Sequence, residues 1–143
     1  MEWISMSQKF LLDSSVWVNF LKGDVPTRTT INKAVSDGYV ISNCGPVVME
    51  VLSGSRIHEE SRVTSMLDSF LTLSHDIHAD YRTAGIMYRE LRRKGVTVKG
   101  SMDCLIAVIV MNHDDVTLIH DDQDFELIAQ HYDLKQERWA RAA

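Results

Sequence analysis

Residues that interrupt regular structure are scarce in this chain. It has 7 glycines and 2 prolines among 143 residues, which leaves little room for flexible linkers, and it contains no internal repeat. No apolar run approaches the roughly 18 residues that span a bilayer, and the N-terminal stretch MEWISMSQKF lacks the basic start and apolar core of a secretory signal. We therefore expect one domain over residues 1–143, cytoplasmic and without a membrane partner, with 1–8 as a loose N-terminal extension and 135–143 as a C-terminal tail.

Cysteine and basic residues are also few. The 2 cysteines, Cys44 and Cys104, lie in apolar surroundings without CxxC spacing, so we expect them to be reduced, buried and unconnected with a metal. The net charge of −5 and the pI near 5.6 argue against a protein that coats nucleic acid. Chemistry on phosphate groups would therefore need a bound cation or local basic patches.

What the chain does have is a regular alternation of short apolar runs and longer amphipathic ones, which is typical of α/β proteins. The pattern predicts strands at 9–13, 39–43 and 116–120, with a short extended piece around Leu73. Helices are expected at 14–23, 26–38, 45–54, 62–73, 80–95, 102–111 and 124–134. The strands are short and apolar, so we expect a mostly parallel sheet with helices on both faces.

Two of these helices have informative faces. Tyr81, Ala84, Tyr88 and Leu91 recur at helical spacing, which predicts that they form the buried stripe of the helix at 80–95. The helix at 102–111 is apolar on every side except for Asp103, so it belongs in the core.

Five acids follow strands or begin helices. Asp13 ends the first strand, Glu50 lies in the helix after the second, Asp103 begins the apolar helix, and Asp122 and Asp124 follow the last strand. Strand C-termini in an open parallel sheet share one edge, where ligands bind. The acids could therefore meet there.

Taken singly, each acid has a simpler explanation. Asp13 could cap the next helix, Glu50 could be solvated, and Asp122 and Asp124 could belong to a polar turn. Asp103 could favour the positive end of its helix, worth roughly 0.3–1 kcal/mol. Asp103 is the hardest to explain in this way, because a helix that is apolar all round leaves its only acid partly buried, and a buried charge needs a partner or a metal.

Taken together, the acids predict a metal site. Two carboxylates about 4 Å apart repel by roughly 4 kcal/mol at an effective dielectric near 20, so several in one cleft would demand a cation. Oxygen ligands without histidine or cysteine suit Mg²⁺ or Mn²⁺ rather than Zn²⁺. Such an ion polarises a phosphoryl oxygen and activates water, which is the chemistry of phosphodiester hydrolysis.

Four segments carry a family resemblance: FLLDSSVWVNFL, GPVVMEVLSG, ELRRKGVTVKGSMDCLIA and LIHDDQDFELIA. In this order, from about Phe10 to Leu134, they resemble the PIN-domain ribonucleases, and more narrowly the VapC-type toxins of prokaryotic type II toxin–antitoxin pairs. The resemblance implies a PIN-like, three-layer α/β/α fold. It also implies a Mg²⁺- or Mn²⁺-dependent endoribonuclease that forms a homodimer and is inhibited by a cognate VapB-like antitoxin.

The resemblance also implies roles for single residues. The catalytic acids would be Asp13, Glu50, Asp103 and Asp122. The metal ligands would be Asp13, Asp103, Asp122 and Asp124. Ser15 would support the metal site, and Asp121 falls where the family requires no acid. His120 stands where many relatives carry Thr or Ser, and it could either contact the scissile phosphate or serve in packing or capping.

Basic and apolar surface residues leave alternatives open. The run at 89–94 could be a solvated helix face or a patch for RNA phosphates. Lys99 and Arg56 are better placed for RNA contacts. Trp17, Phe20 and Leu21 could pack in the core or meet a partner. Two other functions remain: an RNA-maturation nuclease without an antitoxin, and an inactive PIN-like module that binds RNA or protein. The complete acid set argues against the second.

Overall fold

A parallel sheet organises the protein, whose computed structural model describes residues 8–139. Its strands are β1 (Lys9–Leu12), β2 (Val40–Asn43), β3 (Leu71–Thr72), β4 (Val116–His120) and β5 (Gln136–Arg138). They lie in the order β3-β2-β1-β4-β5, and every pairing among the described residues is parallel. The predicted α/β class with a parallel sheet is confirmed.

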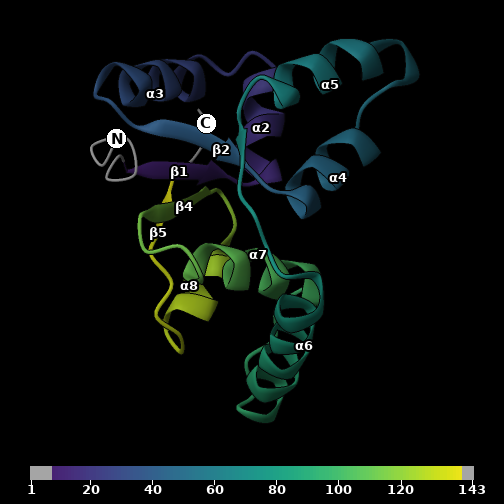
Figure 1. The fold of residues 1–143 in the computed structure, drawn as a ribbon, viewed down its shortest axis with the longest axis vertical. Coiled ribbons are helices and arrows are strands. Elements are labelled where there is room, and N and C mark those ends of the chain that lie inside the picture. Colours follow the sequence, from purple (N-terminus) through teal and green to yellow (C-terminus); the bar gives the residue numbers. More distant parts are fainter. Residues whose placement is uncertain (1–7, 140–143) are drawn as a thin grey trace.

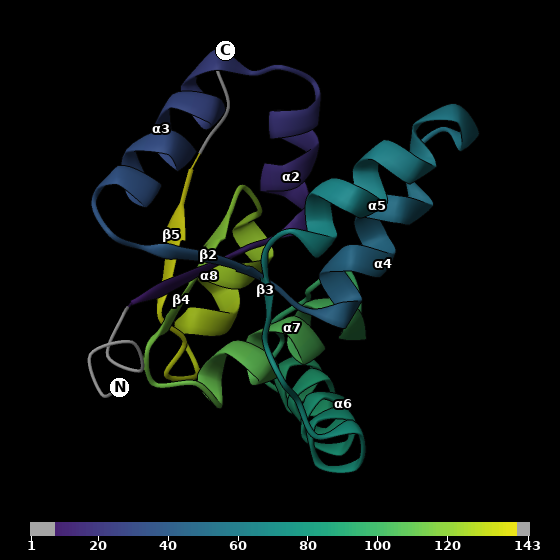
Figure 2. The same cartoon turned by 45° about the horizontal axis from the view of Figure 1, so that its top comes forward.

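The connecting segments are helical, as parallel connections require. They are α2 (Ser14–Leu21), α3 (Val25–Ser36), α4 (Gly45–Ser53), the 3₁₀ turn η1 (Ile57–Glu59), α5 (Glu60–Asp68), α6 (Ile77–Arg93), α7 (Ser101–Met111) and α8 (Gln123–Ala129). In Figure 1, α2, α3 and α5 lie on one side of the sheet and α6, α7 and α8 on the other. Figure 2 shows the same layers from a second direction. The three-layer α/β/α arrangement is therefore as predicted.

The sheet has a topological switch point between β1 and β4, where the order in which strands are added changes side. After β1 the chain adds β2 and β3 on one side, and it then crosses back to place β4 on the other side of β1. Leu12 and Ile119 are register partners at the ends of these two strands, and the Asp13 amide donates to the Ile119 carbonyl at 2.9 Å. Such a switch point is where open α/β sheets bind ligands, and here it brings Asp13 beside the residues that follow β4.

Helix α7 forms the centre of the core, as its apolar composition predicts. Its residues from Cys104 to Val110 are all buried. Both cysteines are buried and reduced, which also agrees with the prediction. None of the helices between residues 8 and 139 is both long and apolar enough to cross a membrane.

The buried stripe of α6 differs from the prediction. Ala84 and Leu91 are buried as expected, but Tyr81 is 52% exposed, and Asp80 and Met87 are buried instead. Asp80 can be buried because its carboxylate accepts hydrogen bonds from the Asp76 amide at 3.0 Å and from the Asn112 side chain at 2.8 Å. A partnered acid therefore takes the place that hydrophobic spacing assigned to a tyrosine.

The C-terminal segment also differs from the prediction. Residues 136–138, expected in a tail from 135 onward, form the edge strand β5 beside β4. Three residues carry too short a pattern to be recognised as a strand, and this one forms because β4 offers an open edge. Residues 1–7, most of the predicted N-terminal extension, and 140–143 lie outside the described residues.

Candidate active site

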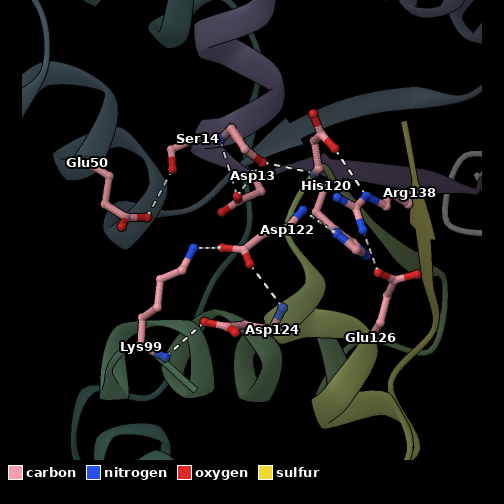
Figure 3. Close-up of polar contacts among 11 residues, drawn as sticks. Asp13, Ser14, Glu50, Lys99, His120, Asp122, Asp124, Glu126 and Arg138 are labelled. Carbon is pink, nitrogen blue, oxygen red and sulfur yellow. Dashed lines mark hydrogen bonds and ion pairs between the residues drawn. The ribbon is translucent and has the colours of Figure 1, made fainter. Parts of the chain in front are cut away.

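Four of the five predicted acids line one cavity at the switch point of the sheet, and the fifth, Asp124, is buried and does not line it. The cavity has a volume of about 520 Å³, and Asp13, Ser15, Glu50, Asp103 and Asp122 are among its lining residues. Asp13 follows β1, Asp122 follows β4, Glu50 comes from α4 and Asp103 from the first turn of α7. Figure 3 shows the carboxylates of Asp13, Glu50 and Asp122 around this space, and that of Asp124 beside the Lys99 backbone amide.

Asp103, Asp122 and Asp124 form the tightest group. Each offers a carboxylate oxygen, and these oxygens lie within 4.8 Å of one another. Asp124 is 2% exposed, and its carboxylate accepts a hydrogen bond from the Lys99 amide at 2.9 Å. Asp122 caps α8, because its Oδ1 accepts from the Asp124 amide at 3.0 Å. Local helix capping thus fixes the two acids of the DxDF segment relative to each other.

The two oxygens of Asp13 have different roles. Oδ2 caps α2 by accepting from the Ser15 amide at 3.2 Å and from the Ser15 hydroxyl at 2.7 Å, so the capping explanation is correct for this oxygen. Oδ1 is buried and has no hydrogen-bond partner within the part of the chain that the structure describes. A buried oxygen without a donor costs free energy, and this one suits a cation as its partner.

Ser15 ties the ends of the two central strands together. Its hydroxyl donates to Asp13 and accepts from the backbone amide of Asp121 at 3.0 Å. The predicted supporting residue therefore contacts the side chain after β1 and the backbone after β4, and it holds these two segments at a fixed separation.

Glu50 lies on the opposite wall of the cavity. It is half-buried, and its Oε1 is 3.3 Å from the Ser14 hydroxyl, which donates to it. Glu50 and Asp13 are not members of the tight group of carboxylates formed by Asp103, Asp122 and Asp124.

Burial, and then neighbouring negative charge, raise the pKa values of three of these acids. Burial and then the charges of Asp122 and Asp13 raise the pKa of Asp103 from 3.8 to about 8. Burial also raises the pKa of Asp13, and burial together with the Asp13 charge raises that of Glu50. Without a cation, ionisation of these carboxyl groups is disfavoured, so the arrangement suits a divalent ion.

The sequence comparisons agree with this site. The PIN domain family matches residues 10–130. Ribonuclease VapC11 of Mycobacterium tuberculosis is 32% identical over 124 residues, covering 84% of this chain and 91% of the relative. The VapC ribonuclease Mb1587 of Mycobacterium bovis matches to the same extent. This chain belongs to the PIN-domain family, among the VapC ribonucleases.

Solved structures of more distant proteins share the fold of this PIN domain. The DNA-bound VapBC of Salmonella typhimurium has a TM-score of 0.72 at 21% identity, covering 93% of this chain and 99% of that chain. VapBC2 of Rickettsia felis, bound to a DNA fragment from its promoter, has a TM-score of 0.70 at 19% identity, covering 92% and 99%. The predicted PIN-like fold is thereby confirmed.

His120 serves in capping and packing in this PIN domain. It is fully buried, its Nδ1 accepts from the Asp122 amide at 3.1 Å, and its Nε2 lies 2.6 Å from Oε1 of Gln136. Asp121 pairs with Arg138, whose Nε lies 3.1 Å from Asp121 Oδ1. The sequence assigned no role to Gln136 or Arg138, because both lie in the segment predicted as a tail.

The two predicted RNA-contacting residues lie in different places. The Lys99 ammonium is 3.4 Å from Asp122 Oδ2, and its side chain is 74% exposed. Arg56 lines a separate cavity of about 370 Å³, together with Val18, Val51 and Val63. Of the two, only Lys99 contacts an acid of the candidate metal site.

Proposed function

We propose that this PIN domain is a Mg²⁺- or Mn²⁺-dependent endoribonuclease that acts as the toxin of a toxin–antitoxin pair. The observation that carries the proposal is the convergence of Asp13, Glu50, Asp103 and Asp122 on one cavity, from elements far apart in the sequence. The ribonuclease relatives and the family match support the same function.

The donors fit a hard divalent cation. Asp103, Asp122 and Asp124 lie at mutual distances suited to shared ligation, and Asp13 adds the buried Oδ1, which lacks a hydrogen-bond partner in the described chain. All of these ligands are carboxylate oxygens, which Mg²⁺ and Mn²⁺ prefer. When bound, such an ion makes water a stronger nucleophile and stabilises charge on the phosphate.

Other residues of the chain would supply the remaining functions. Glu50 is half-buried on the cavity wall with a raised pKa, which suits a group that accepts the proton of the attacking water. Ser14 orients the Glu50 carboxylate through their hydrogen bond. Lys99 stands at the exposed rim beside Asp122 and would contact an RNA phosphate. In-line attack by water would leave a 5′-phosphate and a 3′-hydroxyl.

The partner proposed for this toxin is a VapB-like antitoxin. The similar solved structures are VapBC complexes, and the ribonuclease would act on RNA in the cytoplasm, as a homodimer. An RNA-maturation nuclease without an antitoxin is the alternative, and an adjacent short gene for a DNA-binding protein would favour the toxin.

Two experiments test the proposal. Purified protein should cleave RNA with Mg²⁺ or Mn²⁺, lose the activity in EDTA, and recover it when metal is restored. Induced expression should arrest growth, whereas Asp13→Ala and Asp103→Ala versions at equal abundance should not. If both variants arrest growth as strongly as the unsubstituted protein, the metal-nuclease function is wrong. Sequencing the ends of cleaved RNA from the arrested cells would identify the substrate.

A further inference from the structure

Buried His120 and half-buried Gln136 form a hydrogen-bonded pair that the proposed reaction does not use directly. His120 is the last residue of β4 and is 0% exposed. Its ring lies against Phe125 of α8, with the ring centroids 5.2 Å apart. Gln136 begins β5, and its Oε1 lies 2.6 Å from His120 Nε2. The imidazole is therefore enclosed between the edge strand, helix α8 and the loop that carries Asp122.

The contacts of the ring define its tautomer. The Asp122 backbone amide is always a donor, so the Nδ1 that it contacts at 3.1 Å must offer a lone pair. A neutral imidazole then carries its proton on Nε2, and this proton is donated to the Gln136 amide oxygen. One hydrogen bond thus sets the other: Gln136 holds the proton on Nε2, and Nδ1 remains an acceptor.

The hydrogen bonds between Gln136 and His120 and between His120 and the Asp122 amide form a relay that ends at the Asp122 backbone. Its amide is held by His120, its backbone is extended with φ −144 and ψ 122, and its Oδ1 accepts from the Asp124 amide. Oδ2 is left on the cavity side, where Lys99 contacts it. With the backbone and one carboxylate oxygen both held, the Asp122 carboxylate has one orientation toward the cavity.

We propose that Gln136, acting through the Nε2–H tautomer of His120, is a positioning residue for the Asp122 carboxylate. The proposal rests on the proposed function, because it takes Asp122 to be a metal ligand. With the proton on Nδ1 instead, two donors would face each other at the Asp122 amide, and the loop would move. Groups that orient a metal ligand in this way are typically worth about 10–100-fold in metal affinity.

The strand register explains why Gln136 is suited to this role. Arg138 is the register partner of His120. Gln136 lies two residues before Arg138, so Gln136 and Arg138 point to the same face of β5. Gln136 is half-buried, whereas Glu137 is exposed between them on the other face. Glu137→Gln therefore changes the same strand without touching the relay.

The test uses the full chain and three variants. Gln136→Leu removes the acceptor while keeping similar volume, Gln136→Glu keeps an acceptor for Nε2–H, and Glu137→Gln is the matched control. Long-range ¹H–¹⁵N NMR of the metal-free protein reports the His120 tautomer, calorimetry reports Mn²⁺ affinity without RNA, and thermal scans report stability. We expect Gln136→Leu to lose the pure Nε2–H form and to bind Mn²⁺ about 10-fold more weakly. We expect Gln136→Glu to keep both properties only while the imidazole is neutral, because a protonated ring carries a donor on both nitrogens and cannot accept from the Asp122 amide.

Each outcome decides the matter. Unchanged Mn²⁺ affinity in Gln136→Leu, or a loss equal to that in Glu137→Gln, would overturn the positioning role while leaving the nuclease intact. An Nδ1–H tautomer in the unsubstituted protein would also overturn it, even if the leucine variant did not fold. Absence of Mn²⁺ binding by the unsubstituted protein would overturn the proposed metal site, and this inference with it.

Discussion

Burial and the charges of neighbouring aspartates raise the pKa of Asp103 to about 8. In the metal-free protein this carboxyl group must either keep a proton that the unfolded chain would release or carry a poorly solvated charge. Both options cost free energy of folding. A bound divalent cation removes that cost, which explains why an acid stands in the first turn of an otherwise apolar helix.

Replacing Asp103 by asparagine separates stability from metal binding. Asp103→Asn keeps the shape but needs no proton, so we expect the metal-free protein to gain about 2–5 °C in Tm at pH 7.5. Mn²⁺ affinity should fall at least roughly 100-fold, because even groups that only support a ligand are worth about 10–100-fold, and RNA cleavage should be lost. Calorimetry and thermal scans measure both effects.

Asp121→Asn is the matched control for this experiment. Asp121 lines the same cavity, but its carboxylate pairs with Arg138, a partly exposed ion pair of the kind worth up to about 1 kcal/mol. Its Mn²⁺ affinity should stay within about threefold of the unsubstituted value. An equal loss in both variants would mean that general negative charge, rather than ligation, attracts the ion.

Lys99 is expected to act oppositely on metal and RNA. Its ammonium neighbours Asp122, and that charge raises the pKa of Lys99. In Lys99→Met we therefore expect Mn²⁺ to bind equally well or a few-fold more tightly, because a competing cation is gone. RNA cleavage should fall by roughly tenfold and depend less on salt, because a phosphate contact is lost. Titration of Mn²⁺ and cleavage rates at several NaCl concentrations measure the two effects.

Arg56→Gln tests the second predicted RNA contact. Arg56 lines the neighbouring cavity rather than that of the acids, so this variant should leave Mn²⁺ affinity unchanged and reduce cleavage less than Lys99→Met. A larger loss of RNA cleavage in Arg56→Gln than in Lys99→Met would place the RNA path over the cavity that Arg56 lines.

At the scale of single elements, the start of α2 contributes both to the fold and to the candidate metal site. Asp13 caps the helix with one oxygen, and the other is buried without a hydrogen-bond partner in the described chain. The same aspartate therefore supplies a local folding signal and a candidate metal ligand, and no choice between the capping and metal explanations is needed.

The adjacent serines of α2 allow a matched comparison. Ser15→Ala removes the hydroxyl that donates to Asp13 and accepts from the Asp121 amide, so we expect a loss of about 1–3 kcal/mol in stability. Mn²⁺ affinity should fall about tenfold, because Asp13 loses its orienting partner. Ser14→Ala removes one long contact to Glu50 and should change both quantities little. Similar losses in both variants would contradict a special role for Ser15.

Helices α7 and α6 differ in how well their sequence pattern predicts burial. Helix α7 is apolar on every face, and its burial follows from composition. The predicted stripe of α6 was wrong at Tyr81, because the Asp76 amide and Asn112 make Asp80 tolerable inside. Asp76 is the N-cap of α6 itself, whereas Asn112 lies at the end of α7, so no local pattern reveals the second partner.

At the scale of the whole molecule, the gathered acids should make stability depend on pH. Asp13, Glu50 and Asp103 all have raised pKa values in the fold. Acids of this kind contribute stability that is fully present below about pH 4, the unfolded value, and is lost as the pH rises through the folded value. The metal-free protein should therefore lose Tm steadily from pH 5 to pH 8.

Metal should reverse this trend. A cation favours the ionised carboxylates, so the gap between the Tm with Mn²⁺ and the Tm in EDTA should widen as the pH rises from 6 to 8. Thermal scans at several pH values measure the gap, and Asp103→Asn should make the EDTA series flatter. A gap that is constant with pH would mean that these acids do not bind the ion.

From the residues alone follow the α/β class, the order of the main elements, the buried α7 helix and the set of acids. Each depends on local pattern: apolar runs for strands, helical spacing, and acids at the transitions between elements. The family resemblance added the PIN-like fold and the ribonuclease function. Short segments are enough to predict the elements and the buried helix, because hydrophobic periodicity acts over neighbouring residues.

Only the tertiary structure decides which of the acids lie close together and which lie apart. It places Asp103, Asp122 and Asp124 in one group, sets Glu50 apart on the opposite wall, and separates Arg56 from Lys99. It also turns residues 136–138 from a tail into a strand whose Gln136 reaches His120. The physical reason is that these contacts join residues distant in the chain, and their distances depend on the packed sheet rather than on any local sequence pattern.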